Sequence, residues 1–216
     1  MTKIIGISGK KQSGKNTVAN YINGKVLKSK EMVEDFRLND KGQLEVLTSN
    51  ESGGERGWGV FDILRKDKVF IDYAEANMWP FIKVYHFADY LKKMCIELFD
   101  LRPEQVYGTD EDKNTFTPYV AEGIGLKDKD VLDNAHMTAR EFLQYLGTDV
   151  MRKIKDTVWV DATIKLIDRE RPLLAIIPDV RFPNEIKAIH NAGGIVLRLD
   201  RDILESNHKC ETALER

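Results

Sequence analysis

The fold class is indicated by one run near the start of the sequence, Lys3-Ile4-Ile5-Gly6-Ile7-Ser8-Gly9-Lys10-Lys11-Gln12-Ser13-Gly14-Lys15. It opens with an isoleucine-rich run that predicts a short buried strand, and the residues after it carry Val18, Ala19 and Ile22 at helical spacing. Between strand and helix lies a loop with the spacing G-x-x-x-x-G-K. The order of strand, glycine-bounded loop and helix is the context in which such a loop binds phosphate.

The residue types of this loop suit a phosphate group. Glycines let the backbone curl so that successive N–H groups point inward at phosphate oxygens, and the helix N-terminus adds its positive end. An ordinary glycine-rich turn with a solvated lysine is the alternative, but strand, loop and helix all fall in register, which favours phosphate binding. The residues expected to bind the nucleotide are Gly9, Lys11, Ser13, Gly14, Lys15, Asn16 and Thr17, with Lys15 reaching the β and γ phosphates.

The residues after the loop lysine depart from the common pattern. Asn16 occupies the place where a serine or threonine usually binds Mg²⁺, and Thr17 follows one position later. Magnesium is still expected, because it bridges the β and γ oxygens of ATP in nearly all such chemistry. We therefore expect the metal to be held through water with help from Thr17.

Composition sets limits on the kind of protein. A chain of 216 residues and 24.8 kDa can bury one core, which favours a single domain with an inserted part. The apolar runs are too short to span a bilayer, and the first residues pass directly into a strand, so a cytoplasmic protein without a leader is expected. A net charge of −2 argues weakly against a nucleic-acid polymer as partner, and two cysteines predict no disulfide framework.

The rest of the chain alternates between strand and helix patterns. Apolar runs predict strands at 82–87, 173–177 and 194–199, and helical spacing recurs at 138–146, 158–167 and 184–192. This alternation predicts an α/β fold with a mainly parallel sheet covered on both faces.

Two segments interrupt that alternation. Residues 35–79 change pattern and contain a hairpin signal, Asn39-Asp40-Lys41-Gly42, between two alternating runs, so they are expected to be an insertion with its own small hairpin. Residues 102–137 are polar and irregular with several glycines, which predicts a mobile loop or lid. Within them, Thr109 to Asp112 form a helix capping box.

Several segments together resemble one family. These are Gly14-Lys15-Asn16-Thr17, His86-Phe87-Ala88-Asp89-Tyr90-Leu91-Lys92, the run from Arg140 to Asp149 with Trp159, and Pro178-Asp179-Val180-Arg181-Phe182-Pro183-Asn184-Glu185. As a set they resemble the deoxynucleoside monophosphate kinases of tailed phages. The resemblance covers the loop and most of residues 82–214, but not 35–79.

The resemblance implies a P-loop NTPase-like three-layer sandwich, forming one kinase domain over residues 1–216. It implies transfer of the γ-phosphoryl group of ATP to a deoxynucleoside monophosphate (dNMP), with Mg²⁺ as cofactor. The acceptor phosphate is itself a nucleophile, so no general base is needed, but arginines must converge on the charged oxygens. The expected partner is a small nucleotide, with a homodimer left open and no membrane.

The end of the 173–177 strand carries the strongest catalytic candidates. Arg181 follows this strand at the carboxyl edge, where ligands of α/β sheets bind, and is expected to clamp the acceptor phosphate. The alternative is a surface arginine that caps a turn. Asp179 could order Mg²⁺-bound water or hold Arg181 in place, and the sequence does not separate these roles.

Other candidates have structural explanations that compete closely with function. Arg140 and Arg152 flank a segment in which Gln144 offers an amide suited to a base edge, yet a solvated helix face explains them nearly as well. Aromatic rings could stack on a base, but a core position is preferred for Trp159. Phe87 is kept as a substrate-binding candidate, and Arg201 as a candidate for the ATP phosphates or the adenine face.

Two other kinds of function are compatible with these residues. One is another small-molecule P-loop kinase, such as the dephospho-coenzyme A type, because fold alone does not determine substrate. The other is a binding module that uses its nucleotide state as a switch. The resembling family also continues through one more strand and helix, whereas this sequence stops at Arg216, which leaves room for an exposed sheet edge.

Overall fold

The structure is a computed structural model of the chain, and it describes residues 2–10, 12–48, 56–120 and 136–200. Contacts within the chain divide it into two compact units. The first comprises Met1–Phe87 with Val160–Arg216, and the second comprises Ala88–Trp159. The expectation that one kinase domain covers the whole chain stays a prediction.

The first unit is built on a four-stranded parallel sheet with the order β5-β8-β1-β9. Its central strands are strongly apolar, and Ile7, Ile176 and Ile177 are fully buried. Strands buried on both faces read as continuous apolar runs, which is why the sequence located them. The strands are β1 (Lys3–Gly9), β5 (Ile82–Val84), β8 (Leu174–Val180) and β9 (Ile195–Leu199).

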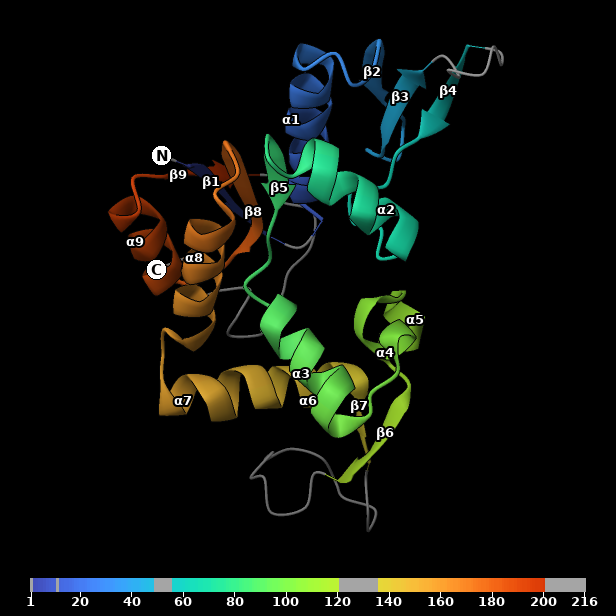
Figure 1. Cartoon of the computed structure of the whole chain (residues 1–216). Helices are drawn as coiled ribbons and strands as arrows, with labels where there is room; N and C mark the ends of the chain where they lie inside the picture. Colours follow the sequence, from blue (N-terminus) through green and yellow to red (C-terminus); the bar gives the residue numbers. More distant parts are fainter. Residues whose placement is uncertain (1, 11, 49–55, 121–135, 201–216) are drawn as a thin grey trace. The chain divides into compact units, whose positions relative to one another are not determined.

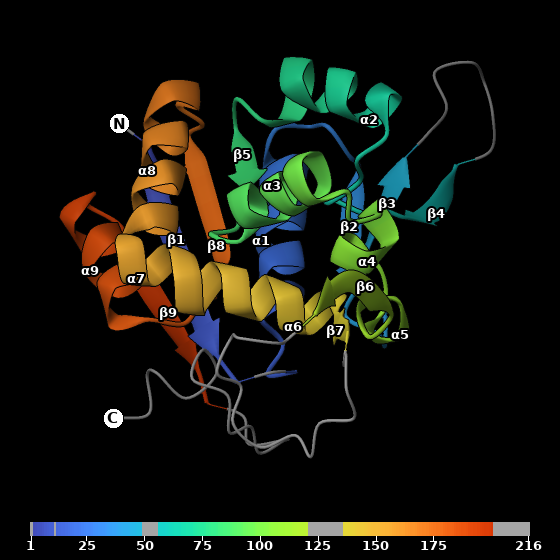
Figure 2. The same ribbon diagram turned by 90° about the horizontal axis from the view of Figure 1, so that it is seen from below.

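Helices cover both faces of this sheet. Helix α1 (Lys15–Ser29) lies on one face, and α8 (Val158–Glu170) and α9 (Pro183–Asn191) lie on the other (Figures 1 and 2). Most of α8 belongs to the first unit, although its first two residues are grouped with the second. A parallel sheet between two helical layers confirms the predicted α/β three-layer architecture.

One predicted strand was too long. The apolar run at 82–87 forms a strand only over β5, after which Tyr85 donates its backbone N–H to Ile176. The Tyr85 and Phe87 side chains are nevertheless buried, at 2% and 3% exposed. Apolar character at these positions therefore reflects core packing, which sequence periodicity does not distinguish from a strand.

The predicted hairpin within residues 35–79 is confirmed. A three-stranded antiparallel sheet has the order β2-β3-β4, and the turn at residues 39–42 joins its first two strands. A short helix and a π-helical segment follow the hairpin, and neither was predicted from the sequence. These elements are β2 (Asp35–Leu38), β3 (Leu44–Thr48), β4 (Gly57–Val60), α2 (Lys68–Tyr73) and η1 (Ala74–Met78).

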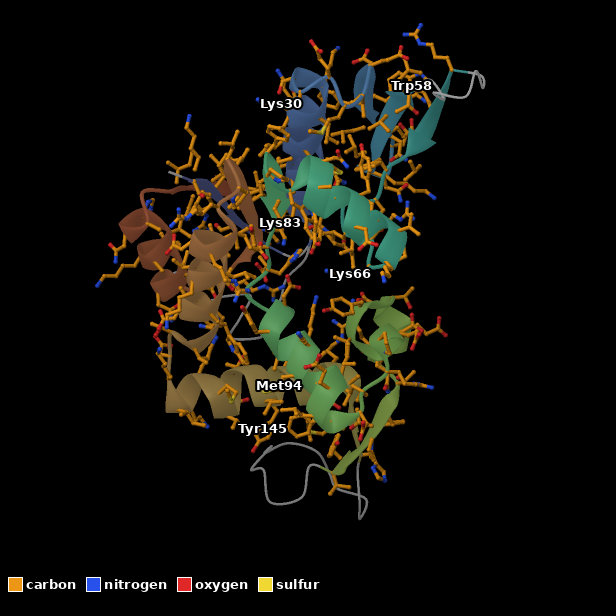
Figure 3. The ribbon with its side chains drawn as sticks, in the orientation of Figure 1. Lys30, Trp58, Lys66, Lys83, Met94 and Tyr145 are labelled. Carbon is orange, nitrogen blue, oxygen red and sulfur yellow. The ribbon has the colours of Figure 1, made fainter. Side chains whose placement is uncertain are left out.

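The inserted elements share a small core of their own with α1. Buried Leu27 of α1 packs in one cluster with Leu44, Phe70 and Met78 from the insertion. The outer strand β4 is more open: Trp58 lies on it (Figure 3), 40% exposed, with the Arg37 guanidinium 4.3 Å from its ring centroid. Apolar burial on one side thus holds the small sheet against α1.

The contact between α1 and the hairpin depends on a glycine in the middle of the helix. A Cβ at Gly24 would clash with the Phe36 ring, lying 2.6 Å from its Cγ, and would lie 2.8 Å from Leu44 Cδ1. A glycine inside a helix costs about 1 kcal/mol relative to alanine, so close packing must offset that loss. The Tyr21 and Phe36 rings form an edge contact beside it, with centroids 5.6 Å apart.

We expect Gly24→Ala to lower the free energy of unfolding by about 1–2 kcal/mol, because overpacking outweighs the gain in helix propensity. Urea unfolding followed by circular dichroism measures this. The matched control is Gly57→Ala, since a Cβ at Gly57 meets no atom within 4 Å in the part of the chain that the structure describes. An unchanged or higher stability of Gly24→Ala would show that the hairpin is not packed against α1 in this way.

The second unit contains short helices and a small antiparallel sheet (Figure 1). The rings of Phe99, Tyr119 and Phe142 contact one another at its centre, with centroids 4.6–5.8 Å apart. The elements are α3 (Asp89–Phe99), α4 (Pro103–Tyr107), α5 (Asp110–Lys113), β6 (Phe116–Val120), β7 (His136–Thr138), α6 (Ala139–Gln144), η2 (Tyr145–Met151) and α7 (Arg152–Ile154).

The expectation of an irregular segment at 102–137 was wrong for its first half, because residues 103–120 form α4, α5 and β6. Proline at the first position of α4 and the predicted capping box at Thr109 start these helices, and both signals are local. Residues 121–135 lie outside the described part, and a lid role for 102–137 stays a prediction.

The preference for a structural Trp159 is supported by its surroundings. The side chain is 6% exposed, and its indole N–H donates to the Gly147 carbonyl at 3.0 Å. Gly147 lies in η2, where a Cβ would come 2.5 Å from Leu91 Cδ2 of α3. Trp159 therefore belongs to the packing of the second unit.

Candidate functional site

The loop between β1 and α1 has a backbone that depends on its glycines. Gly14 has φ 94° and Gly9 has φ 151°, both in the region that favours glycine. A Cβ at Gly9 would lie 2.5 Å from Ser13 Oγ and 2.9 Å from the Leu199 carbonyl oxygen. The two glycines of the G-x-x-x-x-G-K pattern are thus required by the conformation itself.

The Ser13 and Lys15 side chains make the loop suited to an anion. Ser13 is 6% exposed, and its hydroxyl has no hydrogen-bond partner among the described residues. The Lys15 ammonium donates to the carbonyls of Gly9 and Lys10, both at 2.5 Å, so it lies across the loop. A buried hydroxyl without a partner and an ammonium held at the helix start are groups that phosphate oxygens would satisfy.

The residues after Lys15 differ in their surroundings. Asn16 is exposed, whereas Thr17 is partly buried beside Gly42 of the β2–β3 turn. The roles of Asn16 at the nucleotide, and of Thr17 at the nucleotide and the metal, stay predictions. Lys11, the other expected phosphate ligand, lies outside the described residues.

The register of the sheet brings the loop and the end of β8 to one edge. Ser8 pairs with Val180, so Gly9 and the residues after Val180 leave the sheet side by side. Asp179 accepts a hydrogen bond from the Phe87 backbone N–H at 3.1 Å, which ties the ends of β8 and β5 together. The candidates Lys15, Asp179 and Arg181 therefore lie at the same carboxyl edge, as predicted from strand ends.

A buried carboxylate fixes the backbone around Arg181. Glu185 is 1% exposed and accepts hydrogen bonds from the Arg181 N–H at 2.6 Å and the Phe182 N–H at 3.0 Å. It occupies the third position of α9, where a carboxylate also interacts favourably with the helix N-terminus. Glu185 was not among the residues predicted to have a role; Pro183 followed by an acid two residues later was the signal that could have identified it.

The Phe87 ring is buried, whereas a ring that stacks on a base must be accessible to it. Its side chain is only 3% exposed, and its backbone rather than its ring contacts Asp179. Base stacking by Phe87 stays a prediction, and burial in the core is its observed role. Arg201 lies outside the described residues.

The remaining substrate-binding candidates belong to the second unit. Arg140 of α6 forms an ion pair with Asp110 at 2.7 Å and donates to Asn114 Oδ1 at 3.0 Å, so it links α6 to α5. Gln144 is the last residue of α6, four positions further along, and is partly buried. Arg152 Nη1 donates to the Asp156 carbonyl at 3.5 Å.

The residues expected at the metal do not form a preassembled cluster. Among the described residues there is no group of three or more His, Cys, Asp or Glu side chains that could hold a metal ion. The expected role of Asp179 at Mg²⁺ stays a prediction.

A parallel α/β sheet with a glycine loop between its first strand and first helix, and charged side chains at the same edge, defines the class of P-loop phosphate-binding proteins. Within that class, a sequence model of the deoxynucleotide monophosphate kinase family matches residues 3–215, and the chain belongs to this family. The matched range runs through residues 35–79, which the resemblance seen in the sequence did not cover.

A curated relative gives the same indication. The chain is 34% identical over 142 residues to a protein of Acanthamoeba polyphaga mimivirus that bears the name "Putative deoxynucleotide monophosphate kinase". The similar region covers 59% of this chain and 66% of the relative. The predicted family is thereby confirmed, and this relative comes from a giant virus rather than from a tailed phage.

Proposed function

We propose that this protein transfers the γ-phosphoryl group of ATP to a deoxynucleoside monophosphate, forming ADP and the corresponding diphosphate. The observation that supports this most is the shared sheet edge, where the Lys15 loop lies beside the strand end that carries Asp179 and Arg181. Family membership adds the acceptor class, since the family is described as deoxynucleotide monophosphate kinases.

The loop residues are assigned to the donor. Backbone N–H groups of the Gly9–Gly14 loop and the start of α1 bind the phosphate oxygens, and Ser13 donates its hydroxyl. Lys15 exchanges its two loop carbonyls for β and γ oxygens as they arrive. Asp179 and Thr17 would hold Mg²⁺ largely through water, and the ion would offset charge on the β and γ oxygens.

Arg181 is assigned to the acceptor. An acceptor monophosphate is already nucleophilic, so the enzyme must mainly position it and neutralise its charge. A guanidinium can bind two phosphate oxygens at once, and Glu185 fixes the backbone from which it extends. Arg140, Gln144, Arg152 and Phe87 are proposed as further substrate-binding residues.

The proposal also includes the partners of the enzyme and its location in the cell. Its partners are small nucleotides rather than a nucleic-acid polymer or a membrane, its place is the cytoplasm, and a homodimer is compatible with it. Across the described ranges, none of the helices has both the length and the apolar character needed to traverse a bilayer.

An ADP-release assay over the four dNMPs and their ribose counterparts tests the function. We expect ADP formation that depends on an added dNMP and yields the diphosphate in equal amount. Dephospho-coenzyme A is assayed in parallel, because its preferential phosphorylation would replace the acceptor assignment. ATP hydrolysis that no acceptor accelerates would instead favour a nucleotide-dependent switch.

A further inference from the structure

The turn that joins β2 and β3, residues 39–42, has a defined and rigid geometry. Asn39 Oδ1 accepts hydrogen bonds from the backbone N–H groups of Lys41 and Gln43, both at 3.0 Å. The Gly42 N–H closes the turn on the Asn39 carbonyl at 2.8 Å, and Gly42 has φ 73°. An asparagine side chain that binds its own turn in this way specifies one conformation.

This turn contacts the N-terminal part of α1. The Asn20 side-chain amide donates to the Gly42 carbonyl at 2.9 Å. A Cβ at Gly42 would lie 3.2 Å from both Cβ and Cγ2 of Thr17, and closer still to its hydroxyl oxygen. Thr17 and Asn20 lie three residues apart on one face of α1, and Gly24 continues that face against Phe36.

The position of this contact matters because Thr17 is only two residues beyond Lys15. Threonine in a helix divides between two side-chain rotamers, so a neighbour that leaves room for one hydroxyl position selects between them. Gly42 leaves that room, since any side chain there would collide with the Thr17 hydroxyl. The inserted sheet thus reaches the start of the helix on which the phosphate loop depends.

We propose that the β2–β3 turn is part of the donor-nucleotide site, with Gly42 and Asn20 as positioning residues that set the Thr17 hydroxyl for ATP. This rests on the proposed binding of ATP at the Lys15 loop. It gives the insertion a function in catalysis: the turn orients a ligand of the donor phosphates or their metal, while the rest of the small sheet anchors the turn to α1.

Gly42→Ala tests the proposal against a matched control. Gly193 has nearly the same φ, 75°, but a Cβ there meets no atom of the described residues within 4 Å. Both substitutions introduce similar backbone strain, so Gly193→Ala reports strain alone. We expect Gly42→Ala to raise the KM for ATP about tenfold while the KM for dNMP changes less than about twofold, and Gly193→Ala to alter neither.

A double-mutant cycle with Thr17→Ala tests whether the effect of Gly42→Ala on the KM for ATP depends on the Thr17 hydroxyl. If Gly42 acts through the Thr17 hydroxyl, Thr17→Ala raises the KM for ATP by itself, and adding Gly42→Ala changes it little further. Fully additive effects, or a wild-type KM for ATP in Thr17→Ala, would overturn the proposal. Melting temperatures of all variants separate positioning from loss of fold.

Asn20→Ala provides an independent test of the proposal if Gly42→Ala folds poorly. It removes one amide-to-carbonyl hydrogen bond, as does the control Asn77→Ala, whose amide donates to the Tyr73 carbonyl at 3.0 Å. We expect only Asn20→Ala to raise the KM for ATP, by about three- to tenfold. Equal effects in both variants would overturn the proposal, whereas failure of the donor assignment would show separately as full activity of Lys15→Ala.

Discussion

Lys15→Ala is expected to reduce the rate of phosphoryl transfer by about a thousandfold, because it removes the charge placed at the β and γ oxygens where negative charge develops. The fold should persist, since the ammonium donates to the loop carbonyls of Gly9 and Lys10 and is not part of the apolar core. Steady-state rates of dNMP-dependent ADP formation measure the first effect, and thermal unfolding measures the second.

Lys25→Ala is the matched control for this variant. Lys25 is an exposed lysine on the same helix, 5.9 Å from the centroid of the Tyr21 ring, and it is ten residues beyond the loop lysine. It should keep wild-type activity. Near-normal turnover in Lys15→Ala would remove the basis for placing ATP at this loop.

The second large effect is expected for Arg181→Lys, which should lower kcat/KM for dNMP by about a hundredfold while leaving ATP affinity unchanged. A lysine keeps the charge but not the planar pair of donors that fits two phosphate oxygens. The backbone N–H at this position stays bound to Glu185 in either case, so the change isolates the side chain. Acceptor kinetics at saturating ATP, together with calorimetric titration of ATP, measure the two quantities.

Arg169→Lys is a suitable control, because Arg169 is exposed near the end of α8. It should behave as the wild type in both assays. A loss of ATP affinity in Arg181→Lys, with an unchanged KM for dNMP, would assign Arg181 to the donor instead.

The phosphate loop and the parallel sheet could be predicted because their signals are local. The glycines at 9 and 14, the isoleucine-rich strand and the helical spacing after Lys15 all lie within one short stretch. The hairpin at 39–42 was predicted for the same reason, since asparagine and glycine there specify the turn.

Other features depend on contacts between distant residues and left no local signal. The π-helical segment η2 is placed where Gly147 packs closely on Leu91, a neighbour far away in sequence. The contact of Gly42 with Thr17 likewise joins the insertion to the loop helix across the chain. Asp179 and Arg181 were located by strand ends, but only the register with β1 places them beside the loop.

The position of β1 in the sheet also has a consequence for synthesis of the protein. Both strands that flank β1 come from the far end of the chain, with Lys3 paired to Leu174 and Ile5 paired to Ile195. At roughly 5–20 residues per second, a ribosome needs on the order of ten seconds or more to supply those partners. During that interval the nascent apolar strand has no place in its sheet, whereas α1 and the β2–β3 hairpin can already pack together.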